Sequence, residues 1–129
     1  MKTEISNEWK IREALVYEIM QVSQKYYPNE FAGMLGVGEV ESHYITELVV
    51  VPYTSGKTFA EFRWDLIPFD PLIVGTIHSH PSYSLHPSIA DASTFSKLGK
   101  IHVIVAKPFS IDHFQAYDSQ SRRVEMKRV

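Results

Sequence analysis

The chain has 129 residues, a length that fits one domain, and 44% of its residues are hydrophobic, which is enough to build a buried core. Fifteen acidic residues against thirteen Lys and Arg residues leave a net charge of −2, which argues against a basic nucleic-acid-binding face. Cysteine is absent, which excludes disulfides and thiolate metal sites, so any metal must be held by nitrogen and oxygen atoms. No apolar stretch has signal-peptide or membrane-spanning length, so we expect a cytoplasmic protein without membrane contact.

Hydrophobic periodicity predicts a layer of strands with a helix on each side. In chain order the expected elements are a helix over 9–26, strands over 31–37 and 44–51, a loop over 52–57, strands over 58–66 and 72–78, a helix over 87–98, and strands over 101–106, 109–117 and 122–129. Ser6 is the expected N-cap of the first helix and Pro28 its stop, whereas Gly99 closes the second helix. The last two strands are expected to pair antiparallel. The pattern predicts one domain over 1–129, of the α/β or α+β class, with a mixed sheet between helices.

The side chains best suited to chemistry follow the apolar strand predicted over 72–78. His78 and His80 are two residues apart, so on an extended chain both imidazoles project from the same face of the strand end. Pro81 ends the strand, and Asp91 lies in the first turn of the next predicted helix, from which it can fold back toward the imidazoles. Two histidines and one carboxylate leave a zinc ion one open coordination position, as in catalytic rather than structural sites. The sequence therefore predicts one catalytic zinc ion and hydrolytic chemistry.

Each part of this pattern also has an ordinary structural interpretation. A His-x-His pair often consists of partly buried residues without a metal, and Ser88 with Asp91 is typical of a helix N-terminus with a capping serine. The conjunction of a strand end, a proline stop, a short loop and an acid in a first helical turn favours the metal site. Ser88 is then a candidate donor to a developing oxyanion. Glu30 is a candidate proton shuttle, although from the residues alone a solvated loop acid is the more usual account.

The combined pattern resembles the motif of the JAMM (MPN-plus) metallopeptidases, which reads Glu, then His-x-His-Pro, then Ser-x-x-Asp after a short loop. The matching positions are Glu30, His78, Ser79, His80, Pro81, Ser88 and Asp91, with Pro28, Gly33 and Leu35 similar to the motif around the glutamate. The resemblance covers Leu15 to Ala106 in element order. It implies a cytidine-deaminase-like fold with a mixed sheet flanked by helices. It also implies zinc bound by His78, His80 and Asp91, Glu30 as general acid and base, and Ser88 steadying the oxyanion.

The resemblance further implies zinc-dependent cleavage of the amide or isopeptide bond at the C-terminus of a ubiquitin-like protein. The expected partner is that modifier or its lysine conjugate, and the small size is similar to the prokaryotic and archaeal branch of the family. One alternative keeps the chemistry but processes a ubiquitin-like sulfur carrier. Another, from a different class, is a non-catalytic scaffold, which the presence of all five site residues disfavours. Nucleobase deamination shares the implied fold but usually needs cysteine ligands.

The remaining histidines and aromatic residues have open interpretations. His86, in the loop between the two halves of the motif, either meets the metal or substrate or is an exposed histidine without a role. His43, His102 and His113 are assigned to the scaffold. Aromatic residues near the loops could line a groove for an extended tail that adds beside a free sheet edge. These residues are Phe31, Tyr53, Phe62, Trp64 and Tyr83, and core packing is favoured for Phe62 and Trp64.

Overall fold

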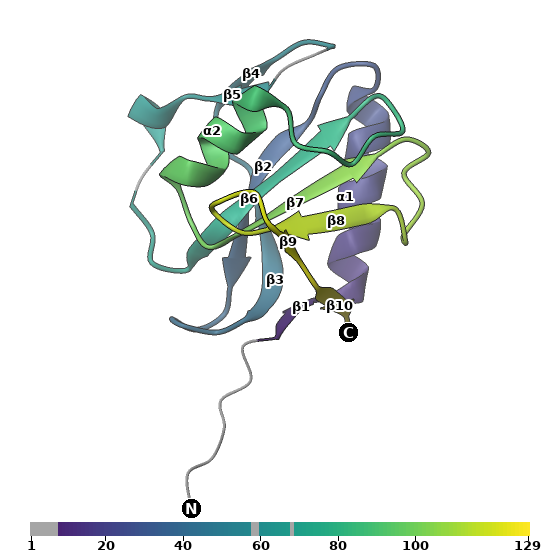
Figure 1. Cartoon of the computed structure of the whole chain (residues 1–129). Coiled ribbons are helices and arrows are strands. Elements are labelled where there is room, and N and C mark those ends of the chain that lie inside the picture. Colours follow the sequence, from purple (N-terminus) through teal and green to yellow (C-terminus); the bar gives the residue numbers. More distant parts are fainter. Residues whose placement is uncertain (1–7, 58–59, 68) are drawn as a thin grey trace, which may run out of the picture.

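The computed structural model describes residues 8–57, 60–67 and 69–129, which form a curved eight-stranded mixed sheet flanked by helices (Figure 1). The strands of this main sheet are β1 (Trp9–Ile11), β2 (Ala32–Val37), β3 (Tyr44–Val49), β6 (Ile73–His80), β7 (Ile101–Ala106), β8 (Phe114–Tyr117), β9 (Arg123–Val124) and β10 (Met126–Arg128). A separate sheet pairs β4 (Tyr53–Ser55) with β5 (Ala60–Phe62) and is followed by the 3₁₀ turn η1 (Trp64–Leu66). The helices are α1 (Glu13–Tyr26) and α2 (Ile89–Lys97). This arrangement confirms the predicted fold class.

Strand β6 occupies the centre of the main sheet, whose order is β10-β1-β3-β2-β6-β7-β8-β9. It pairs antiparallel with β2 and parallel with β7, and helix α2 lies in the crossover between the two parallel strands. The run from Val74 to His80 is buried throughout, as predicted for a strand covered on both faces. Because β2 runs antiparallel to β6, the start of β2 and the end of β6 lie at the same end of the strands, and α2 begins there as well.

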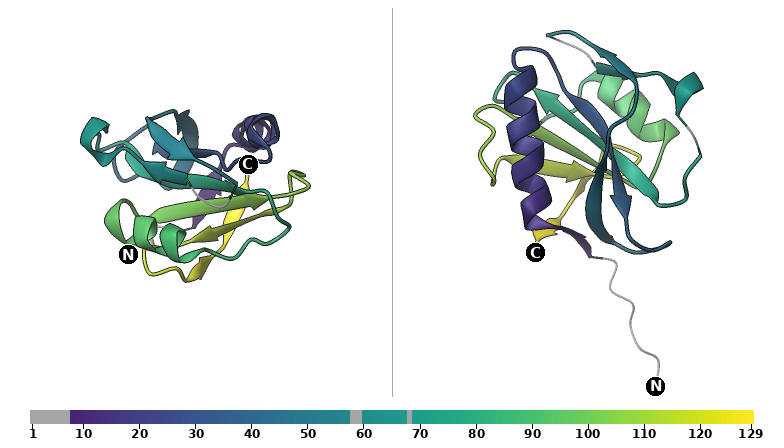
Figure 2. Two further views of the ribbon diagram at one scale, coloured as in Figure 1. Left: turned by 90° about the horizontal axis from the view of Figure 1, so that it is seen from above. Right: turned by 180° about the vertical axis from the view of Figure 1, so that it is seen from behind.

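The two border strands of the main sheet, β9 and β10, stand at opposite ends of the strand order but are neighbours in the chain. Glu125 alone separates Val124 of β9 from Met126 of β10. Because consecutive Cα atoms are about 3.8 Å apart, the two borders must come together, and the sheet curls beside α1 (Figure 2). Among the described residues, the small β4–β5 sheet also has unpaired strand edges.

The two helices cover opposite faces of the main sheet, with α2 in front of it and α1 behind it in Figure 1. Helix α1 buries Leu15 and Ile19, which belong to its predicted apolar face. On the other side, Phe95 of α2 packs with Ile104 and Tyr117. Within the described ranges, no helix combines the length and the hydropathy that a membrane-spanning helix needs.

The first element differs from the prediction. Trp9–Ile11 is a strand rather than the start of the helix, and α1 begins at Glu13. Ser6, the expected N-cap, lies outside the described residues. The two apolar side chains of β1 flank exposed Lys10, and β1 pairs in parallel with both β3 and β10. A spacing of two residues that continues into a spacing of four suits both a strand and a helix, so these distant partners decide which forms.

Several short segments of the middle and the C-terminus also differ from the prediction. The loop predicted over 52–57 contains β4, and the strand predicted over 58–66 shortens to β5 followed by η1, with residues 58 and 59 outside the described residues. The final antiparallel pair is confirmed for β8 and β9, but residues 109–113 precede the strand and β10 pairs in parallel with β1. These short strands depend on partners far away in the sequence, which local periodicity does not reveal.

Candidate metal centre

The residues of the predicted motif lie at the end of the main sheet where β2 begins, β6 ends and α2 begins. His78 and His80 project to the α2 face: the ring centroid of His78 is 6.0 Å from that of Phe95, and Nε2 of His80 is 2.9 Å from Oδ2 of Asp91. Ser79 forms a different contact, in which its Oγ accepts a hydrogen bond from the N–H of Phe31 at 2.7 Å. This alternation confirms the prediction that both imidazoles share one face of the strand end.

Three of the predicted site residues bring donor atoms together. Glu30, His80 and Asp91 are all buried, and each offers a ligand atom within 4.8 Å of the others, a group that could hold a metal ion. Nδ1 of His80 lies 2.9 Å from the carbonyl oxygen of Ser84. Because a carbonyl can only accept, Nδ1 carries the hydrogen, and this bond orients the ring so that Nε2 faces the group.

The contact between His80 and Asp91 calls for a positive charge. With its hydrogen on Nδ1, neutral His80 turns a lone pair of Nε2 toward a carboxylate oxygen 2.9 Å away, so two acceptors face each other. Either a proton on Nε2 or a metal ion relieves this repulsion. In the absence of a metal the proton is favoured: burial lowers the pKa of His80, but its hydrogen bonds to Asp91 and Ser84 and the charges of Asp91 and Glu30 raise it overall. A site that stabilises a proton here is chemically suited to a divalent cation.

His78 stands outside the group of converging donors, although it was predicted as a ligand. Its side chain is fully buried against Phe62 and Phe95, with its ring centroid 5.5 Å from that of Phe62, and neither ring nitrogen has a hydrogen-bond partner. Burial lowers the pKa of His78 to about 4, so the imidazole is neutral at pH 7 and keeps a free lone pair. A buried nitrogen without a partner costs about 1–3 kcal/mol. These unpaired nitrogens fit a side chain that awaits a ligand.

Glu30 is buried rather than solvated, which corrects the usual account of a loop acid. Its residue is 7% exposed, and its N–H donates to the carbonyl of Gly56 at 2.8 Å. Burial raises the pKa of the Glu30 carboxyl from 4.5 to about 7; the neighbouring charge of His80 lowers it and that of Asp91 raises it. A carboxyl with a pKa near neutrality can both take and give a proton at physiological pH.

Ser88 and Asp91 form the N-terminal cap of α2. The N–H of Asp91 donates to Oγ of Ser88 at 3.0 Å, and the N–H of Ser88 donates to Oδ2 of Asp91 at 2.9 Å, which completes a capping box. Burial raises the pKa of Asp91, but the hydrogen bond with His80, the charge of His78 and the bond from Ser88 together hold it below its usual value. The capping interpretation is therefore confirmed, and it places the Asp91 carboxylate beside His80.

The other histidines separate into scaffold and loop residues. His102 is buried, stacks on Phe95 with ring centroids 4.4 Å apart, and shares a 2.7 Å hydrogen bond between its Nδ1 and Oγ1 of Thr76. His43 stacks on Trp9 with centroids 4.3 Å apart, in keeping with a scaffold role. His86 is exposed and does not belong to the group of converging donors among the described residues.

The aromatic residues named as candidates for a groove lie in different surroundings, and the groove itself stays a prediction. Phe31 and Phe62 are core residues, 1% and 5% exposed, so the core interpretation holds for Phe62. It is wrong for Trp64, which is 38% exposed because it begins η1 at the surface rather than continuing a strand. Trp64 and Phe62 line a cleft of about 230 Å³ together with residues of α2. Tyr83, in the loop after β6, is 65% exposed.

Two features of the centre had no signal in the sequence. The carbonyl of Ser84 orients His80, but a backbone oxygen leaves no trace in the residue type. His113 donates from Nε2 to the carbonyl of Tyr83 at 3.1 Å and so supports the same loop, although it lies far along the chain. Both contacts depend on the path of the loop between β6 and α2.

Comparison with known sequences relates nearly the whole chain to one family. A family model for prokaryotic homologs of the JAB domain matches residues 12–124. A probable metalloprotease of Haloferax volcanii is 35% identical over 107 residues, which make up 77% of this chain and 66% of that protein. The match thus spans slightly less than two thirds of the archaeal protein.

Solved structures with the same fold point to the same family. The crystal structure of a JAB1/MPN domain protein from Archaeoglobus fulgidus has a TM-score of 0.73 and 28% sequence identity, over 96% of this chain and 100% of that one. A structure described as JAMM, a metalloprotease-like zinc site in the proteasome and signalosome, has a TM-score of 0.73 and 28% identity, over 95% of this chain and 99% of that one. Together with the motif and its geometry, these matches show that the chain belongs to the JAB/MPN (JAMM) family of metalloprotease-like proteins.

Proposed function

We propose that the protein is a zinc-dependent hydrolase that cleaves the amide or isopeptide bond at the C-terminus of a small ubiquitin-like protein. The observation that carries this proposal is the buried contact of Nε2 of His80 with Oδ2 of Asp91, where either a proton or a metal ion must balance the carboxylate. The family, a relative named a probable metalloprotease and a structural neighbour with a zinc site support the same conclusion.

The proposed zinc ligands are His78, His80 and Asp91. His78 contributes a neutral imidazole without other partners, His80 an oriented Nε2, and Asp91 a carboxylate that stays ionised. Glu30 has donor geometry as well, but its raised pKa suits a group that exchanges protons better than a permanent anionic ligand. Three protein ligands leave a coordination position for the substrate or a water molecule. When bound, zinc supplies a Lewis acid that polarises the scissile carbonyl and makes the attacking water more acidic.

Two side chains carry the proposed proton transfer and charge stabilisation. Glu30 accepts a proton from the attacking water on its carboxylate and returns it to the nitrogen of the leaving amine, and a pKa of about 7 suits both steps. Ser88 donates its hydroxyl hydrogen to the oxyanion of the tetrahedral intermediate. Its oxygen already accepts from the N–H of Asp91, so the hydroxyl hydrogen is free to point elsewhere.

The substrate tail is proposed to lie along the β4–β5 sheet. This small sheet has open edges beside the centre, since Phe62 of β5 contacts the ring of His78. An extended tail that adds as a strand there would place its terminal carbonyl near the proposed ligands. The cleft lined by Trp64 and Lys97 continues from this sheet toward α2 and offers apolar and charged contacts to the residues that precede the tail.

Metal analysis coupled to an activity assay tests the proposed function. We expect the purified chain to bind one zinc ion per molecule, as measured by mass spectrometry of the metal. It should release a lysine-linked ubiquitin-like protein, lose this activity in a chelator and regain it when zinc is added. His80→Gln should bind little zinc, whereas His86→Gln, which changes an exposed loop histidine, should bind as much as the wild type. Cleavage that persists in the metal-free chain, or failure to retain zinc, would contradict the proposal.

Replacement of Ser88 separates its two roles. We expect Ser88→Ala to lower kcat by about 10²–10³ because the oxyanion loses a donor. It should also lower the free energy of unfolding by about 1 kcal/mol because the cap of α2 is lost. Ser88→Asp keeps a capping oxygen but, as a carboxylate, has no hydrogen to donate, so it should restore stability but not kcat, whereas Ser88→Thr should restore both. An alanine variant with an unchanged kcat would reduce Ser88 to a helix cap.

A further inference from the structure

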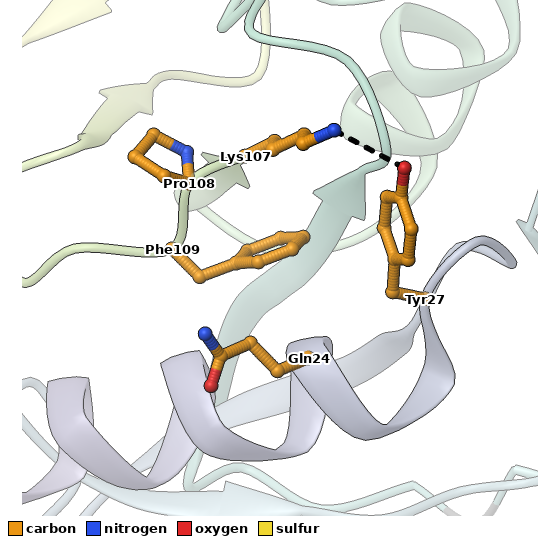
Figure 3. Close-up of a pocket in the computed structure, with 5 residues that line it drawn as sticks. All are labelled: Gln24, Tyr27, Lys107, Pro108 and Phe109. Carbon is orange, nitrogen blue, oxygen red and sulfur yellow. Dashed lines mark hydrogen bonds between the residues drawn. The ribbon is translucent and has the colours of Figure 1, made fainter.

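A second pocket lies on the α1 side of the sheet, away from the face that carries the proposed zinc ligands. It has a volume of about 360 Å³ and is lined by Gln24, Tyr27, Lys107, Pro108 and Phe109 (Figure 3). Gln24 is in the last turns of α1, Tyr27 follows that helix, and the other three residues follow β7. A volume of this size lies within the range of about 300–1,000 Å³ that small-molecule sites occupy.

Each polar group around this pocket can donate a hydrogen bond, and only the ammonium of Lys107 is charged. Lys107 contributes an ammonium, Gln24 an amide and Tyr27 a hydroxyl, and no carboxylate is among the lining residues. The ammonium donates to the hydroxyl of Tyr27 at 3.3 Å and lies 5.2 Å and 5.5 Å from the ring centroids of Tyr27 and Tyr83. Within the described part of the chain, Lys107 has no ion pair with a carboxylate. A cation held by aromatic rings without an anion is available to one.

The pocket also has an apolar wall. The ring of Phe109 points between Lys107 and α1, as Figure 3 shows, and its residue is 9% exposed. It meets the ring of Tyr27 edge to face, with centroids 6.4 Å apart. Phe109 has a φ of 62°, in the left-handed region that a bulky residue rarely adopts. Residues with such unusual backbone angles are found more often at ligand-binding sites than elsewhere.

We propose that this pocket binds a small carboxylate attached to an apolar group. The carboxylate accepts hydrogen bonds from the Lys107 ammonium and the Gln24 amide, and the apolar group packs against Phe109. A neutral polar ligand would use the donors without satisfying the unpaired cation. A cation would meet the ammonium with like charge. An anion without an apolar part would leave the Phe109 wall in water.

Occupancy of this pocket is linked to the loop of the metal centre. The N–H of Lys107 donates to the carbonyls of Ser82 at 3.0 Å and His80 at 3.3 Å, so the backbone of Lys107 holds the start of this loop. The ammonium of the same residue lies over the ring of Tyr83 in that loop. A carboxylate that draws the ammonium toward the pocket therefore changes the surroundings of Tyr83, and this change is a signature of binding at this place.

Titration of the metal-free chain with phenylacetate and with its primary amide tests this proposal. We expect saturable changes in the NMR signals of Gln24, Tyr27, Lys107 and Phe109, and of Tyr83 in the loop, on addition of phenylacetate. The amide has the same shape without the charge, and we expect its affinity to be lower by at least about tenfold. Lys107→Met should weaken phenylacetate binding by a similar factor. Lys25→Met removes an exposed charge from the same end of α1 outside the pocket and should leave binding unchanged.

A second ligand identifies the source of the carboxylate. A short peptide that ends in phenylalanine with a free carboxylate should bind if the pocket receives a chain end, whereas binding of phenylacetate alone marks a small-molecule pocket. The proposal is overturned if neither ligand gives saturable changes, if acid and amide bind equally, or if the changes map elsewhere. Should Lys107→Met fail to fold, Gln24→Ala serves instead, and unchanged phenylacetate binding by that variant counts against the proposal. Because no zinc or turnover is involved, these outcomes are independent of the proposed hydrolase.

Discussion

Glu30→Gln should retain zinc and lose nearly all hydrolytic activity. The amide has almost the shape of the carboxyl but cannot accept and return a proton, so the step that converts water to a nucleophile loses its base. We expect kcat to fall by about 10³–10⁴, near the upper range for removal of a general base. The measurement is the steady-state rate of conjugate cleavage alongside the zinc content of the same sample. Glu47→Gln, which changes an exposed acid on β3, is the matched control and should leave both unchanged.

The same variant separates two roles that the geometry allows for Glu30, since its carboxylate lies within 4.8 Å of donor atoms of His80 and Asp91. Loss of zinc from Glu30→Gln would make this residue a ligand, and retained turnover would remove it from the mechanism. Stability gives an independent readout. Burial raises the pKa of Glu30 from 4.5 to about 7, so the contribution of Glu30 to the stability of the metal-free wild type falls as pH rises from about 4.5 to 7. Glutamine cannot ionise, and the metal-free variant should therefore have the higher Tm at pH 8.

Gly75→Ala should destabilise the whole fold. A Cβ at this position would lie 1.4 Å from the carbonyl oxygen and 2.6 Å from the carbonyl carbon of Ile101, both backbone atoms of the neighbouring strand. Gly75 and Ile101 are paired in the parallel ladder of β6 and β7, so neither strand can move without opening the ladder that leads to His78 and His80. We expect a loss of at least about 3 kcal/mol in the free energy of unfolding, the upper range for overpacking.

Chemical denaturation of Gly75→Ala measures this loss, and Gly38→Ala is its control. A Cβ at Gly38 meets no atom within 4 Å, so alanine there should change stability by less than about 0.5 kcal/mol. If Gly75→Ala is as stable as the wild type, β6 and β7 are farther apart than described. If it folds with reduced stability, its zinc content should fall as well, because both histidines follow this contact on the same strand.

Elements whose formation depends on local interactions were predictable from the sequence, whereas those that depend on partners far away in the chain were not. Helix α2 and strands β2, β6 and β7 were predicted close to their observed bounds because each has a periodic or wholly apolar pattern of its own. Strand β1 was mistaken for helix because Trp9 and Ile11 fit either period until β3 and β10 are placed beside them. The capping box of Ser88 and Asp91 was visible as a local motif.

The centre was predictable in its residues but not in all of its contacts. The spacing of His78 and His80 was sufficient to place both on one face. The burial of Glu30 was not visible, because it depends on the pairing of Ala32 with His78, which joins segments far apart in the chain. The donor atoms that converge belong to Glu30, His80 and Asp91, and His78 is not among them. This grouping likewise depends on how the strand ends and α2 come together in the folded chain.

The single-residue link at Glu125 restricts the main sheet, because it joins the two border strands β9 and β10 directly. The β4–β5 sheet is not restricted in this way. With one residue between the two border strands, the end of β9 is tied to the start of β10, so an insertion there would let these two strand ends move apart. The β4–β5 sheet lies outside the main sheet, so its connections can change in length as long as the contacts of Phe62 with His78 and of Gly56 with Glu30 are kept. We therefore expect that insertions designed for new substrates will be tolerated in the β4–β5 sheet and will disrupt folding between β9 and β10.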